Sequence, residues 1–136
     1  MKKLIYAAMI SASLCAASTA AIAPCIGIVA ADKAVENAYR SAKNYLKTMP
    51  FSKQGLIDQL SSDFGDKYTV EQAAAAVKML EDNKEVNWKK QAVKAGKNYL
   101  KMTGFSRQGL IDQLTSPAGS KFTKKQAEYA ADKLGL

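Results

Sequence analysis

The sequence predicts an all-α protein in which an N-terminal transmembrane helix precedes two tandem three-helix repeats of helix-turn-helix outline. Three observations support this fold class. A stretch of the 136-residue chain occurs twice at a constant offset of 54 residues, apolar side chains recur at helical spacing in both copies, and residues 4–31 carry no charge. We therefore expect three segments, residues 1–31 as the anchor, 32–84 as the first repeat and 85–136 as the second.

The N-terminal segment is long enough to cross a bilayer, which takes about 20 apolar residues as a helix. A cleaved signal peptide is the alternative, because a basic start and an apolar run with small residues are also its pattern. The sequence Ala21-Ile22-Ala23 is followed by Pro24, a poor residue after a cleavage point, whereas Ala20 could end a cleavable segment. We expect a retained span, with signal cleavage left open.

Charges beside this segment predict its orientation. Lys2 and Lys3 precede it, and the residues that follow, Asp32, Lys33 and Glu36, bring no positive excess. The positive-inside bias then places the N-terminus in the cytoplasm. The expected protein crosses the inner (cytoplasmic) membrane once and carries its repeats on the periplasmic or extracytoplasmic side.

The first copy is expected to begin with an amphipathic helix over residues 33–48, where apolar side chains are three and four residues apart. Pro50 ends that helix. Ser52 has the chemistry of an N-cap for a short second helix, whose inward face is apolar. The inward residues are Leu56, Ile57 and Leu60.

A turn at residues 63–67 is expected to lead into the third helix. Thr69 and Gln72 have the spacing of a capping box, and the helix that they open should stop near residues 82–83. The second copy repeats each of these capping features, with Ser106 as the N-cap and Thr123 at the capping box. The expected apolar stripe of its first helix is Trp88, Ala92, Ala95, Tyr99 and Leu100.

Composition argues against an enzyme. The chain has no histidine, the commonest general base and a frequent metal ligand. The spacing of Gly104 and Gly109 resembles a phosphate loop, but Leu110 and Ile111 stand where lysine and a hydroxyl residue are required. We predict no catalytic residues, no cofactor and no metal, and interpret the recurring carboxylates Asp58 and Asp112 as a solvated face.

The net charge of +8 is placed unevenly. Residues 32–83 carry seven Lys/Arg and eight Asp/Glu, a net charge of −1, whereas residues 84–136 carry eleven and four, a net charge of +7. Such a basic unit suggests a polyanion or an acidic protein face as partner, although a solvated lysine-rich surface has the same composition. The third helix of the first copy is nearly all alanine and cannot read bases. That of the second begins Lys124-Lys125-Gln126 and could touch phosphates without sequence choice.

The patterns Phe-Ser-x-x-Gly-Leu-Ile-x-Gln-Leu and Gly-x-x-Phe/Tyr-Thr-x-x-Gln-Ala recur over residues 34–136. This pattern resembles the repeat of the host cell surface-exposed lipoprotein (Ltp) family. The resemblance implies a place among prophage-encoded superinfection-exclusion proteins, which sit outside the cell membrane and stop the genome of a second phage from entering. It also implies action on the phage injection apparatus, including the tape-measure protein. Neither Cys15 nor Cys25 follows the small residue of a lipobox, so the chain is more similar to membrane-anchored exclusion proteins of temperate phages of Gram-negative bacteria.

The combined expectation is a membrane-tethered binding protein that blocks injection of phage DNA by contacting the injection machinery or its host inner-membrane channel. A non-specific nucleic-acid-binding module and a structural envelope protein are the alternatives. Charge alone selects the predicted partner-binding residues. They are Lys97, Lys101, Arg107, Lys121, Lys124 and Lys125.

Overall fold

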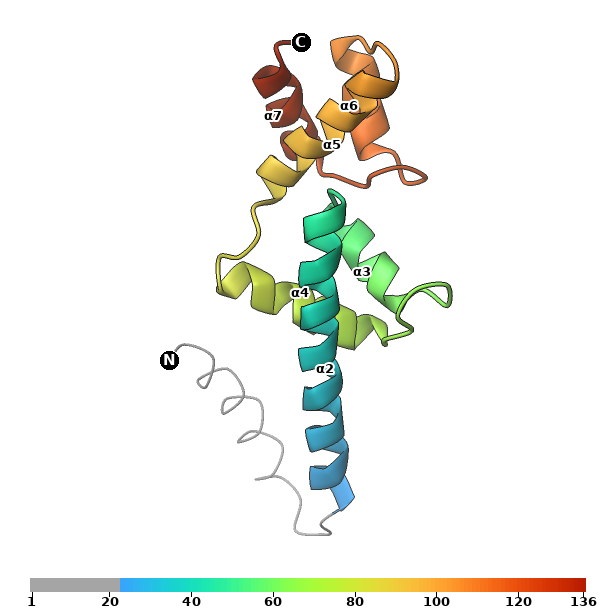
Figure 1. Cartoon of the computed structure of the whole chain (residues 1–136), viewed down its shortest axis with the longest axis vertical. Coiled ribbons are helices and arrows are strands. Elements are labelled where there is room, and N and C mark those ends of the chain that lie inside the picture. The colour runs from blue at the N-terminus through green and yellow to red at the C-terminus, as the bar shows by residue number, and fades with distance from the viewer. Residues whose placement is uncertain (1–22) are drawn as a thin grey trace.

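The computed structural model describes residues 23–136, and every regular element in that range is an α-helix (Figure 1). The prediction of an all-α protein with two three-helix repeats is confirmed for these residues. The first repeat contains α2, α3 and α4, and the second contains α5, α6 and α7. The bounds are Ala23–Thr48 for α2, Lys53–Ser61 for α3, Val70–Asp82 for α4, Trp88–Met102 for α5, Arg107–Thr115 for α6 and Lys124–Leu134 for α7.

Helix α2 begins ten residues earlier than expected, at Ala23 rather than near Lys33. No helix-breaking residue separates the apolar segment from the first repeat after Pro24, and proline is tolerated in the first turn of a helix. The N-terminal end of α2 therefore projects beyond α3 and α4 (Figure 1). Most of the span predicted at residues 4–31 lies outside the described residues, and within residues 23–136 no helix is long and apolar enough to cross a membrane.

Each repeat buries its own core of leucine and alanine side chains. Alanines on the facing sides of α2 and α4, and of α5 and α7, let these helices approach closely, while leucines from α3 and α6 fill the remaining space. Gly96 shows how close the second pair lies, because a Cβ there would come within 2.7 Å of the Leu134 Cδ1 atom. The leucines that are at most 1% exposed are Leu56, Leu60, Leu80, Leu110 and Leu114.

The predicted helix caps are all present. The hydroxyl oxygens of Ser52 and Ser106 accept hydrogen bonds from backbone N–H groups three residues later, at 3.0 and 3.1 Å. Complete capping boxes open α4 and α7, with Thr69 and Thr123 as the N-caps. These contacts satisfy N–H groups that have no partner within the helix, so the helix starts are encoded locally.

The turn that follows α3 returns after α6 with the same geometry. A Cβ at Gly65 would lie 2.1 Å from the carbonyl oxygen of Gln59, and one at Gly119 would lie 2.9 Å from that of Gln113. Both turns end on a lysine in the left-handed region, Lys67 in the first repeat and Lys121 in the second. The chain thus folds back tightly over the end of the short helix.

Trp88 corrects the predicted core of the second repeat. Although it is the first residue of α5, its side chain packs against the core of the first repeat, as does that of Val86. Its indole Nε1 donates a 2.7 Å hydrogen bond to the Glu81 carboxylate on α4. The connection between α4 and α5 is short, so the tryptophan reaches back to the first repeat instead of extending the apolar stripe of α5.

Candidate interaction surfaces

The six predicted partner-binding residues do not form one uniform surface. Lys97 and Lys101 are exposed on α5, and Lys124 and Lys125 are exposed at the start of α7. The other two predicted residues, Arg107 and Lys121, are engaged in contacts that hold helices or repeats together. The structure thus separates four exposed lysines that form no ion pair between helices or between repeats from two cations that do.

Arg107 fastens the start of α6 to the end of α7. One guanidinium nitrogen lies 2.6 Å from the Asp132 carboxylate, and the other donates a 2.6 Å hydrogen bond to the main-chain oxygen of Leu136. The equivalent residue of the first repeat, Lys53, pairs with Glu81 near the end of α4 at 2.8 Å. A cation that begins the short helix and binds the end of the third helix is therefore shared by both copies. The signal available in the sequence was that this position is basic in both.

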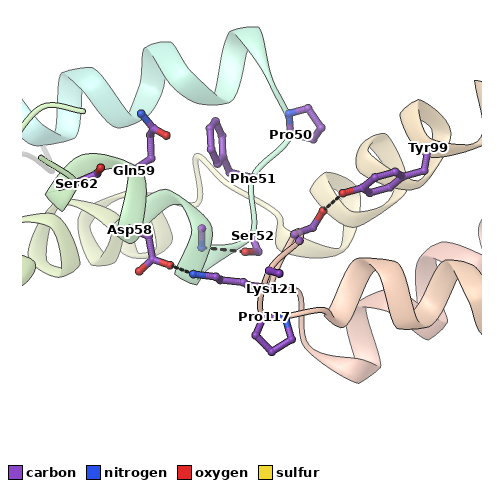
Figure 2. Close-up of a pocket in the computed structure, with 13 residues that line it drawn as sticks. Pro50, Phe51, Ser52, Asp58, Gln59, Ser62, Tyr99, Pro117 and Lys121 are labelled. Carbon is purple, nitrogen blue, oxygen red and sulfur yellow. Dashed lines mark hydrogen bonds and ion pairs between the residues drawn. The ribbon is translucent and has the colours of Figure 1, made fainter. Parts of the chain in front are cut away.

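Lys121 joins the two repeats. Its ammonium forms an ion pair with Asp58 on α3, and Figure 2 shows the two side chains meeting across the gap between the repeats. Asp58 also accepts a 2.8 Å hydrogen bond from the side-chain amide of Gln54. Burial alone raises the pKa of Asp58, but the Lys121 and Gln54 donors outweigh it and hold that pKa below its ordinary value. Asp58 is partly exposed, as expected for a solvated face, but it also forms a contact between the repeats that the sequence did not predict.

A cleft of about 630 Å³ lies beside this ion pair, between the α2–α3 region and the α6–α7 turn (Figure 2). Phe51 and Pro50 line it from the first repeat, and Tyr99 and Pro117 line it from the second. The Tyr99 hydroxyl is 2.9 Å from that of Ser120, which fixes the ring against the turn. The cleft is a product of the way the two repeats meet.

A second set of polar contacts fixes the connection between the repeats. Glu81 accepts hydrogen bonds from Trp88 and from Lys53, and Glu85 binds both Tyr39 and, at 3.2 Å, Lys43. Burial raises the pKa of Glu81, but the hydrogen bonds from its two donors lower that pKa by more. The pKa of Glu81 therefore lies below its ordinary value. Burial and the hydrogen bond to Glu85 both raise the pKa of the Tyr39 hydroxyl. The Glu81 carboxylate is therefore held ionised at neutral pH.

Metal-binding chemistry has no basis in the part of the chain that the structure describes. Within it, no group of three or more histidine, cysteine, aspartate or glutamate side chains is placed to hold a metal ion. The described surface offers charge, hydrogen-bonding groups and a few exposed apolar side chains, among them Phe64 and Met102. These properties suit binding to another molecule.

Two three-helix units with matching caps, turns and cores place the chain among all-α tandem-repeat proteins. The family described as host cell surface-exposed lipoprotein matches residues 33–80 and 87–134, and the chain belongs to this family. The matched segments begin and end at corresponding positions of the two copies. The resemblance seen in the sequence is thereby confirmed.

Among solved structures, the chain is similar to Ltp, a superinfection exclusion protein from the Streptococcus thermophilus temperate phage TP-J34. The two share 34% identity with a TM-score of 0.63, over 76% of this chain and 96% of that one. No curated protein matches the sequence significantly. Neither the family description nor the name of this structure denotes an enzyme.

Proposed function

We propose that this protein acts in superinfection exclusion, by preventing the DNA of an incoming phage from reaching the cytoplasm. The observation that carries the proposal is the two-repeat likeness to the TP-J34 exclusion protein, at 34% identity over nearly all of that chain. The surface-exposed character of the family supports action outside the cytoplasm.

The uncharged residues 4–31 would tether the repeats at the outer face of the inner membrane. The tether confines both repeats to a thin layer in which an injected phage protein or its membrane channel must pass. Confinement raises the effective concentration of the binding surface, so a weak contact with the tape-measure protein or with the channel suffices.

The partner-binding surface proposed for this contact is the exposed basic part of the second repeat, Lys97, Lys101, Lys124 and Lys125. Arg107 and Lys121 act there as positioning residues, because their ion pairs hold α6 to α7 and the second repeat to the first. A partner complementary to this surface carries an excess of carboxylates.

The exclusion activity is tested by infecting cells that express the full chain with a panel of tailed phages, and by measuring adsorption and DNA entry separately. Normal adsorption with blocked DNA entry is the expected result. Infection of every phage at the level of cells without the protein would refute the function.

The contact surface is tested by replacing Lys97, Lys101, Lys124 and Lys125 with glutamate. A matched control replaces four exposed lysines of the first repeat with glutamate, which changes the net charge equally. We expect the first variant to admit phage DNA and the control to exclude it; equal activity of the two would reject this surface. The control lysines are Lys33, Lys47, Lys67 and Lys84.

Non-specific nucleic-acid binding is a second candidate, favoured by the net charge of +7 on residues 84–136. Contacts with phosphates release counterions, so binding to a DNA duplex would weaken steeply as salt is raised. Absence of duplex binding by the purified full chain at low salt would eliminate this candidate.

A further inference from the structure

Four lysines form a single row along the exposed side of α5. Lys90, Lys94, Lys97 and Lys101 are four, three and four residues apart, so they fall within an arc of about 60° and extend over about 16 Å of the helix. The arc is opposite the face of α5 that buries Ala92 and Ala95. We call these four residues the α5 lysine row. Only two of them, Lys97 and Lys101, were selected from the sequence.

The first repeat shows what these positions look like when their charges are neutralised. The residues equivalent to the row are Glu36, Arg40, Lys43 and Lys47 on α2. There Glu36 pairs with Arg40 at 2.8 Å, and Lys43 pairs with Glu85 at 3.2 Å.

In the second repeat no such compensation exists. Glutamate at the first position is replaced by Lys90, and among the described residues none of the four lysines takes part in an ion pair. Four like charges at this spacing repel one another. The repulsion is relieved by an extended anionic surface that contacts all four at once.

The composition of the row indicates which polyanion fits. Protein interfaces are enriched in arginine and aromatic side chains and depleted in lysine. The exposed residues of α5 are five lysines, Asn98 and Met102, with no arginine or aromatic residue among them. Lysine is a flexible point charge without the planar fork by which arginine recognises bases or carboxylates. Clusters of lysines beside a membrane bind anionic headgroups through such undirected attraction.

We propose that the α5 lysine row binds the anionic phospholipid surface of the membrane. Contact along the row lays α5 parallel to the headgroups, with the core of the second repeat on the side away from the bilayer. Because the second repeat lies beyond the C-terminal end of α2 (Figure 1), this contact requires α2 to lean toward the membrane surface. Lys97 and Lys101 also belong to the partner-binding surface proposed above, so the bilayer and an acidic partner would compete for these two lysines. The vesicle test below contains no phage partner and measures the lipid contact alone.

The test measures the reactivity of individual lysines in the full chain. The protein is reconstituted into vesicles of neutral phosphatidylcholine, or of phosphatidylcholine with phosphatidylglycerol, and treated with a membrane-impermeant amine-acylating reagent. Mass spectrometry then gives the acylation rate of each lysine. Because every site is followed separately, attachment of the protein through its apolar N-terminal residues does not obscure the result.

We expect the four row lysines to react at least fivefold more slowly on anionic vesicles than on neutral ones at low salt, and this protection to disappear at high salt. Exposed lysines of the first repeat, such as Lys47 and Lys67, should react alike on both. Equal rates for the row on the two vesicle types would overturn the proposal, as would protection spread evenly over all lysines.

Two further measurements complete the test. A variant with Lys90, Lys94, Lys97 and Lys101 changed to glutamine should lose the extra affinity for anionic vesicles, about fivefold per lysine. A control with the same net charge, in which Lys89, Lys124, Lys125 and Lys133 are changed, should keep most of it. Equal losses in both variants would overturn the row as a site. Protection of the row by a DNA duplex but not by anionic vesicles would assign it to nucleic acid instead.

Discussion

Replacing Gly65 with alanine should destabilise the first repeat, because the added Cβ has no room. It would lie 2.1 Å from the carbonyl oxygen of Gln59 and 3.2 Å from the side-chain nitrogen of the same residue. The nearest obstacle is backbone, so the turn after α3 must shift to admit the methyl group. Overpacking of this kind costs about 1–3 kcal/mol, a large fraction of the 5–15 kcal/mol by which most domains are stable.

Alanine substitutions at two other glycines provide comparisons for the stability cost expected at Gly65. At Gly119 the equivalent contact is looser, 2.9 Å to the carbonyl oxygen of Gln113, so alanine there should cost less. At Gly104 a Cβ meets nothing within 4 Å, so alanine should be neutral or stabilise by up to about 1 kcal/mol through the unfolded state.

The assay is urea unfolding of the full-length protein in mild detergent, followed by circular dichroism. The expected order of stability is Gly104→Ala above Gly119→Ala, with Gly65→Ala the lowest. If Gly65→Ala unfolds at the same urea concentration as Gly104→Ala, the close approach of the turn to α3 is not what the geometry implies.

The remaining predictions concern the contacts between the repeats and the second core. Trp88, the only tryptophan, packs on the first repeat, so its fluorescence should report unfolding of that repeat and shift with Gly65→Ala more than with Gly119→Ala. Because the folded-state pKa of Asp58 lies below its unfolded value, its ion pair with Lys121 stabilises the protein above about pH 4, and this contribution is lost as pH falls through the folded pKa. Asp58→Asn removes the titrating group and should therefore remove most of this pH dependence. Because both partners are more than a third exposed, the substitution should cost only about 0.5 kcal/mol at pH 7, measured by chemical denaturation. Leu114→Ala should cost about 2–5 kcal/mol, since this side chain is fully buried, with helical circular dichroism as the measure.

The helices and their caps were predictable because they depend on residues three or four apart. Ser52 and Thr69 are N-caps that local sequence patterns predict, and the duplication repeats the same patterns at their counterparts in the second copy. The start of α2 differs from the prediction because no helix-breaking residue divides the apolar segment from the first repeat after Pro24. The fall in hydropathy near residue 32 therefore marks no break in the backbone helix.

The contacts between repeats were not predictable from the repeat pattern, because they break its symmetry. Lys121 pairs with Asp58, whereas Lys67 and Asp112 occupy the same places in the other copies and form no such bridge among the described residues. Trp88 lies at helical spacing from Ala92, yet the short connection turns its ring toward the first core. Among the six predicted binding residues, charge identified exposed lysines and structural cations alike, since formal charge carries no information about ion-pair partners.

The most direct test of the central claim is the amount of labelled phage DNA that enters cells after normal adsorption, compared between cells with and without the full-length protein. Blocked DNA entry at unchanged adsorption, for at least one phage of a broad panel, is the result that superinfection exclusion predicts. Equal DNA entry in the two cell types for every phage would show that this chain shares the fold of the exclusion proteins without their activity.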